Sequence, residues 1–191
     1  MYMLFKTILF VGDHAQKYCD LANSNENCSA QLLTYQRENI VTGEKAKVFF
    51  NQQELPFRTA YNRTGLCQDI VRLKDQLLIK CDILIGDPTE LLFQAYVTEL
   101  MESSELTILP IVFFLYPVGM NSLDTRREIS ALILKMKLNN MLTYVVRNPM
   151  DTFVEVMNEV NQLASFTSIT QLESSIENLD YLFGHDAEIL I

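Results

Sequence analysis

Several common signatures are missing from this chain of 191 residues. It has no GxGxxG and no GxxxxGK[ST] segment, which disfavours an ordinary dinucleotide-binding fold and a P-loop. The GxSxG turn of many hydrolases is absent as well. The four cysteines show no CxxC spacing, so nothing predicts a metal site, and we expect reduced thiols. The longest apolar stretch, residues 106–116, is too short to span a bilayer.

Positive charge is also scarce, because 15 Lys and Arg residues stand against 24 Asp and Glu residues, a net charge of -9. A chain this acidic is a poor ligand for nucleic-acid phosphates or an anionic membrane, so we expect neither nucleic-acid binding nor membrane insertion. The amino-terminal segment, residues 1–10, lacks the basic start and cleavage site of a signal peptide, which predicts a cytoplasmic protein. A hydrophobic content of 49% predicts a sizeable core in one domain over residues 1–191.

Apolar runs alternate with segments of helical periodicity. The strand candidates are residues 4–11, 31–35, 46–50, 82–85, 107–116 and 143–147, and the helix candidates are 66–79, 90–102, 126–139, 152–163 and 165–176. Runs that are apolar throughout are typical of parallel strands buried on both faces. The pattern predicts a doubly wound α/β fold with a mostly parallel sheet of about five to six strands and helices on both faces. We also expect a long amphipathic helix over 151–177, a tail over 178–191 and a variable loop over 39–64.

The loops that follow the strands are the places to look for a site, since ligands bind at the carboxyl ends of such sheets. After the first strand comes Gly-Asp-His-Ala at 12–15, where a turn alone explains the single glycine. His14 is a candidate general base, but no partner is identifiable in the sequence. The segment 86–90 leads from a strand into a helix. Asp87 and Glu90 place two negative charges where a phosphate would bind, so helix capping is the favoured role.

The order of these segments resembles the FtsZ/tubulin-like GTPase domain. The resemblance extends in order along nearly the whole chain, although each match is only a few residues. The matching segments are ILFVGDHAQ (8–16), YNRTG (61–65), CDILIG (81–86), LTILPIVFFLYP (106–117), LDTRRE (123–128), VVRN (145–148), FVEVMNEVN (153–161) and ENLDY (177–181).

The resemblance implies a set of site residues and a guanine nucleotide, GTP or GDP, with no metal ligand among them. Its nucleotide-binding positions fall on Gly12, Asn62, Gly86, Thr89, Arg127, Asn148 and Asn158. Its catalytic loop falls on Asn178 and Asp180, and the final acid of that loop is replaced by Phe183.

One departure from the family concerns its glycine-rich phosphate loop, GGGTGTG, which is replaced here by GDPTELL at residues 86–92. Glycines allow the backbone to approach a phosphate closely, whereas Glu and Leu do not. The sequence also stops just after the match to the catalytic loop, without the second domain that the family has. The resemblance therefore implies lost or weakened GTP hydrolysis.

Three functions remain open at this point. The first is a degenerate FtsZ-like pseudo-GTPase that binds itself or an FtsZ- or tubulin-like filament, whose assembly it caps or modulates. Division, segregation or interference with a host cytoskeleton are all compatible with it. The second is a divergent, polymerising GTPase. The third is an unrelated acidic α/β interaction domain.

Overall fold

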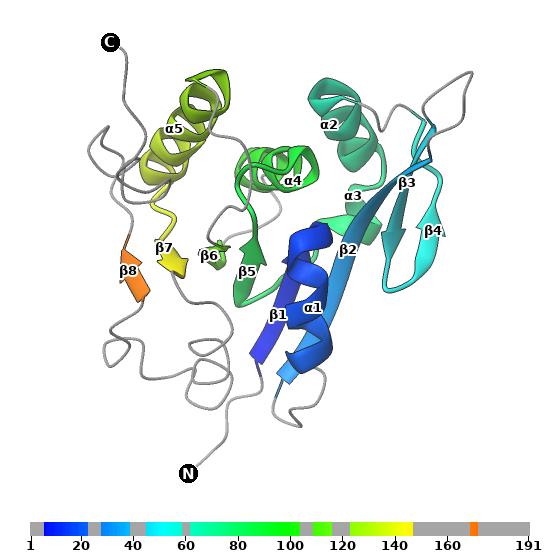
Figure 1. Ribbon diagram of the computed structural model, residues 1–191, viewed down its shortest axis with the longest axis horizontal. Coiled ribbons are helices and arrows are strands. Elements are labelled where there is room, and N and C mark those ends of the chain that lie inside the picture. The colour runs from blue at the N-terminus through cyan, green and yellow to red at the C-terminus, as the bar shows by residue number, and fades with distance from the viewer. Residues whose placement is uncertain are drawn as a thin grey trace.

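Eight strands form one sheet in the computed structural model of this chain (Figure 1), which describes residues 6–22, 28–38, 45–58, 62–103, 109–115, 123–146 and 169–171. The strand order is β4-β3-β2-β1-β5-β6-β7-β8. The strands are β1 (Lys6–Val11), β2 (Cys28–Glu38), β3 (Lys45–Phe50), β4 (Gln53–Leu55), β5 (Ile83–Gly86), β6 (Ile111–Leu115), β7 (Thr143–Val146) and β8 (Ile169–Gln171). The five neighbours β2, β1, β5, β6 and β7 run parallel. Antiparallel pairing adds β3 and β4 at one side and β8 at the other.

The described helices cover both faces of the sheet. They are α1 (Asp13–Ala22), α2 (Arg63–Arg72), α3 (Lys74–Leu77), α4 (Leu91–Glu102) and α5 (Leu123–Leu138). Figure 1 shows α2, α4 and α5 in a row along one side of the sheet, whereas α1 lies against β1 and β2 from the other side. Within the described ranges, no helix is long and apolar enough to cross a bilayer.

The alternation of side chains along β1 separates the two cores. Ile8 and Phe10 pack with Tyr18 of α1, whereas Leu9 and Val11 join the larger core under α2, α4 and α5. All four β1 side chains are fully buried, because a central parallel strand is covered on both faces. This double burial explains why the strand is apolar from Ile8 to Val11.

The predicted fold class is confirmed, since the sheet is mostly parallel at its centre and carries helices on both faces. Each predicted strand overlaps an observed strand, and the observed sheet extends further. The segment expected to be a variable loop, 39–64, contains the hairpin of β3 and β4. The helix α1, which begins directly after the first strand and has ten residues, was not predicted.

The prediction of a helix over 165–176 is wrong at Ile169–Gln171, which form β8. Two of these three residues are β-branched and favour extended backbone. Pairing with β7 supplies the backbone hydrogen bonds that a helix would otherwise make. Residues 147–168 and 172–191, with the rest of the expected long helix and the tail, lie outside the described residues.

The chain reverses its direction across the sheet between β1 and β5. From β1 the chain passes to β2 on one side, and it later returns to place β5 on the other side of β1. In doubly wound sheets such a switch point opens a crevice at the carboxyl ends of the two strands. The turn after β1 and the loop after β5 therefore lie at the same edge.

Candidate functional site

A cavity of about 210 Å³ lies at this switch point. Its walls come from the turn after β1, from β2, and from the loop that leads into α4. The lining residues are Gly12, Asp13, Tyr35, Thr89, Glu90, Leu91 and Leu92. Two of these side chains are acids and none is basic, so the lining combines apolar and acidic side chains.

Gly12 forms the turn between β1 and α1. Its φ of +101° lies in a region that residues with a side chain rarely adopt. Its N–H donates to the carbonyl of Leu33 at 2.8 Å, which fixes the turn against β2. A Cβ atom at this position would stand 1.6 Å from Oε2 of Glu90. Glycine is therefore required here both for the backbone conformation and for the approach of a carboxylate.

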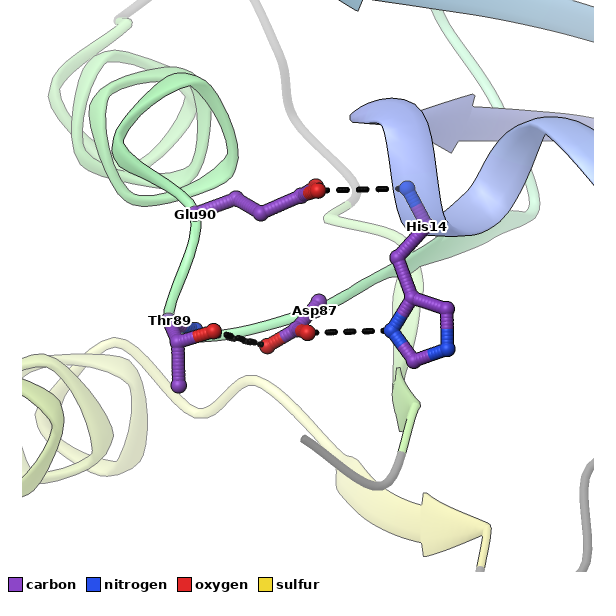
Figure 2. Close-up of polar contacts among 4 residues, drawn as sticks. All are labelled: His14, Asp87, Thr89 and Glu90. Atoms are coloured by element: carbon purple, nitrogen blue, oxygen red, sulfur yellow. Dashed lines mark hydrogen bonds and ion pairs between the residues drawn. The ribbon is translucent and has the colours of Figure 1, made fainter. Parts of the chain in front are cut away.

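Asp87 is buried just after β5 and has several donors around it (Figure 2). Its Oδ1 accepts hydrogen bonds from the N–H and the hydroxyl of Thr89, at 2.8 and 2.6 Å. Its Oδ2 lies 3.0 Å from Nδ1 of His14. A carboxylate in this position favours a proton on Nδ1 of the ring. Asp87 thus connects the start of α1 to the loop before α4. It also accepts the hydrogen bonds that Thr89 of that loop donates.

Glu90 is the N-cap residue of α4, yet its side chain does not cap that helix. It crosses to α1, where Oε1 accepts the N–H of His14 at 3.1 Å (Figure 2). That N–H belongs to the first turn of α1, where main-chain donors have no partner within the helix. The other oxygen, Oε2, is buried and accepts no hydrogen bond from the part of the chain that the structure describes. The carboxylate of α4 therefore occupies the amino-terminal end of α1.

Burial raises the pKa of the Glu90 carboxyl to about 7. The hydrogen bond from the His14 N–H opposes this shift in pKa, while the charges of Asp87 and Asp13 add to it. Burial also raises the pKa of Asp13, partly offset by the N–H of Tyr35, which donates to its carboxylate. Two acids beside one cavity thus hold their protons more tightly than in water, since their charged forms are poorly solvated.

The residues that the resemblance implied are only partly brought together. Gly12, Gly86 and Thr89 lie at the switch point, at the ends of β1 and β5. Asn62 caps α2, where its Oδ1 accepts the N–H of Gly65 at 2.7 Å. The side chain of Arg127 is 72% exposed on α5, 3.9 Å from Asp124. The remaining four residues, Asn148, Asn158, Asn178 and Asp180, lie outside the described residues.

Gly86 has a packing role that the sequence did not reveal. A Cβ on this last residue of β5 would stand 2.1 Å from the ring of Phe93 and 2.8 Å from the carbonyl of Val11. The glycine lets the first turn of α4 pack closely against the sheet. It does not line the cavity, and its role in this structure is close packing.

The structure pairs residues that sequence reasoning had weighed one at a time. His14 had no identifiable partner in the sequence, and Asp87 and Glu90 were assigned to capping. The separation of 73 residues between His14 and Asp87 hid the contact. The available signal was topological: in a doubly wound sheet the residues after two neighbouring strands share one edge.

Replacing Asp87 tests how far this cluster supports the fold. We expect Asp87→Ala to lower the free energy of unfolding by about 2 kcal/mol, because it leaves two partly buried donors of Thr89 without an acceptor. The control is Asp124→Ala on α5, an exposed acid whose ion pair is 3.9 Å long, expected to cost less than about 0.5 kcal/mol. Urea titration at pH 7 measures both, and equal losses would contradict the buried network.

Across the described ranges, no three His, Cys, Asp or Glu side chains lie close enough to hold a metal ion together.

The α/β fold of this chain, a mostly parallel sheet with helices, matches that of a tubulin/FtsZ-like structural neighbour. The particular neighbour is TubZ of Clostridium botulinum phage c-st, a solved structure to which this chain is similar with a TM-score of 0.51. The sequence identity is 11%, and the match covers 93% of this chain and 65% of the TubZ chain. At this identity the likeness shows the fold alone. No family model and no curated protein sequence matches the chain.

Proposed function

We propose that this chain is a pseudo-GTPase of tubulin/FtsZ-like fold, which acts by binding itself or a filament of that fold. The observation that carries the proposal is the filling of the switch point by the protein's own carboxylates. Asp87 accepts both donors of Thr89, and Glu90 accepts the N–H of His14. These are the groups at the starts of two helices that would otherwise be available to a phosphate.

Charge disfavours a nucleotide at this edge, and the switch-point cavity itself is small. Pockets for small molecules and cofactors usually measure about 300–1,000 Å³, whereas the switch-point cavity holds about 210 Å³. Asp13, Asp87 and Glu90 would all face a triphosphate, and like charges at short range repel strongly where water is excluded. Retention of the fold without a receptive phosphate site favours a role in protein contacts.

An exposed apolar surface on α5 and the turn after it supports such contacts. Leu134, Leu138 and Leu142 are 50%, 75% and 47% exposed. The first two are four residues apart and therefore share one face of the helix. Adjacent apolar side chains on a surface commonly mark a site of protein interaction. We assign these three leucines, here called the α5 surface, to contact with the partner.

Nucleotide binding is the first test of the proposal. A fluorescent GTP analogue with Mg²⁺ is titrated with the protein, and unlabelled GTP and ATP serve as competitors. We expect no saturable binding up to millimolar nucleotide and no release of phosphate. Micromolar binding that GTP but not ATP displaces would contradict the proposal and support the divergent GTPase instead.

Assembly is the second test. The protein is added to a polymerising FtsZ- or tubulin-like protein and is also examined alone by sedimentation. We expect a change in polymer mass or self-association, which Leu134→Glu with Leu138→Glu removes. Gln76→Glu, a similar change at an exposed position of α3, is the matched control and should retain the effect. No effect on filaments and a purely monomeric protein would contradict the proposal.

A further inference from the structure

The outer side of α5 carries a regular stripe of exposed residues, opposite the side that is buried in the core. Its members follow one another along the helix at alternating spacings of three and four residues, and they are Asp124, Arg127, Ala131, Leu134 and Leu138. We name these five residues the α5 seam. This spacing is the repeat by which one α-helix packs lengthwise against another. The seam therefore has the pattern of a helix-packing surface.

The sizes of the side chains in the α5 seam suit such a contact. Leu134 and Leu138 expose apolar surface to water, which a second helix would cover. Ala131, at the centre of the seam, is small and exposed. A small residue opposite a large one lets two helices interdigitate at close range. The centre of the seam thus offers both a leucine and the space that receives a leucine.

Charge decides the direction in which a second copy of α5 fits. In a parallel pair each seam residue faces its own equivalent, so Arg127 would stand opposite Arg127 and Asp124 opposite Asp124. Like charges placed opposite each other repel. In an antiparallel pair, with a two-fold axis midway between residues 131 and 134, the residue opposite Arg127 is Leu138. The aliphatic stem of the arginine then covers the leucine while its charged end stays in water.

The same antiparallel arrangement brings opposite charges together beside the seam. Glu128 and Lys135 are seven residues apart and lie on one flank of α5. The two-fold axis places that flank against its own copy, so Glu128 of each copy lies beside Lys135 of the other. Lys135 already contacts Glu102 of α4, and it remains 40% exposed. Two equivalent ion pairs therefore fix the antiparallel direction.

The charge of α5 as a whole also permits two copies of an acidic chain to meet. Within its 16 residues the helix carries four basic and two acidic side chains, whereas the whole chain has a net charge of -9. Repulsion between the copies is therefore weaker at α5 than the overall charge implies.

We infer that α5 is a self-association surface, on which a second copy of this chain packs its own α5 antiparallel, with Leu134 of each copy against Ala131 of the other. This inference rests on the proposed function and names its partner as a second copy. One pair of helices is a small interface, so we expect a weak dimer, with a Kd of about 50 µM.

Sedimentation equilibrium of the whole chain measures this association. Between about 5 and 500 µM the wild-type protein should change from monomer to dimer. Ala131→Glu and Leu134→Glu should each raise the Kd at least about tenfold, because each places a charge in the apolar centre of the contact. The matched control is Val71→Glu on α2, since Val71 is 51% exposed and Leu134 is 50% exposed. A monomeric wild-type protein, or an equal loss with the control, would overturn the inference.

Disulfide cross-linking measures the direction. Arg127→Cys protein is mixed with Leu138→Cys protein under mild oxidation, and the mixture should yield a cross-linked dimer above the wild-type background. Each variant alone should not, because in the antiparallel pair identical residues lie about 16 Å apart along the helix axis, beyond the reach of a disulfide. Cross-linking of either variant alone would show a parallel contact and overturn the inference.

The inference and the proposed function can fail separately. A protein that dimerises through α5 and also binds GTP would refute the pseudo-GTPase and leave the self-association standing. A monomeric protein that alters filaments, with Leu134→Glu removing the effect, would assign the α5 seam to the filament. That result would overturn the inference and support the proposed function.

Discussion

Gly12→Ala is expected to lower the free energy of unfolding by about 2–3 kcal/mol. A residue with a Cβ at φ +101° is strained, which costs roughly 1–2 kcal/mol. The new Cβ would also overlap Oε2 of Glu90, so that side chain must swing out and lose its bond to the His14 N–H. Urea titration at pH 7 measures the loss.

A double-mutant cycle separates the two causes. In the background of Glu90→Ala the overlap no longer exists, and Gly12→Ala should cost only the backbone strain, roughly 1–2 kcal/mol. The expected coupling between the two substitutions is therefore about 1 kcal/mol. Additive effects, with a coupling below about 0.5 kcal/mol, would show that Glu90 does not lie against Gly12.

Glu90→Gln should stabilise the protein at pH 8, by roughly 2 kcal/mol, and leave it nearly unchanged at pH 4.5. The folded state raises the pKa of Glu90 from its ordinary 4.5 to about 7, so it binds the proton more tightly than the unfolded chain. Stability therefore falls as the pH rises from about 4.5 to about 7, and it stays lowered above that. Glutamine keeps an oxygen acceptor for His14 and carries no charge to desolvate.

The measurement is the free energy of unfolding of both proteins in urea at several pH values from 4.5 to 8. Glu54→Gln on β4 is the control, since Glu54 is exposed and lies 3.7 Å from Lys47. It should change stability by less than about 0.5 kcal/mol throughout. A gain from Glu90→Gln that is independent of pH would show that the benefit does not come from removing the buried charge.

The centre of the fold could be predicted from local pattern because burial there is nearly complete. Both faces of β1 are covered, so its apolar run has no polar interruption before Gly12 except Lys6 and Thr7 at its start. The hairpin of β3 and β4 lies at the margin, where polar residues such as Lys47 and Glu54 are tolerated and the pattern is weak. At β8 the apolar residues have helical spacing in the sequence, but the segment forms a strand because it pairs with β7.

The site was less predictable than the fold, because the residues that form it are far apart in the sequence. Gly12 was found because it directly follows a strand. The contacts of His14 with Asp87 and Glu90 depend on β5 lying beside β1, a pairing between segments more than 70 residues apart. The acidic character of the loop 86–90 was plain in the sequence, but the sequence did not show that its carboxylates bind the start of α1.

The two edge strands of the sheet limit how this protein can bind another copy of itself. At one edge of the sheet, β4 has three residues, and its polar residues Gln53 and Glu54 are exposed. β8 at the opposite margin is equally short. Edges this short, with a charged residue at one of them, are poor templates for a strand from a neighbouring molecule. A growing polymer of this chain would therefore join through its helices and loops and would not run a continuous sheet from subunit to subunit.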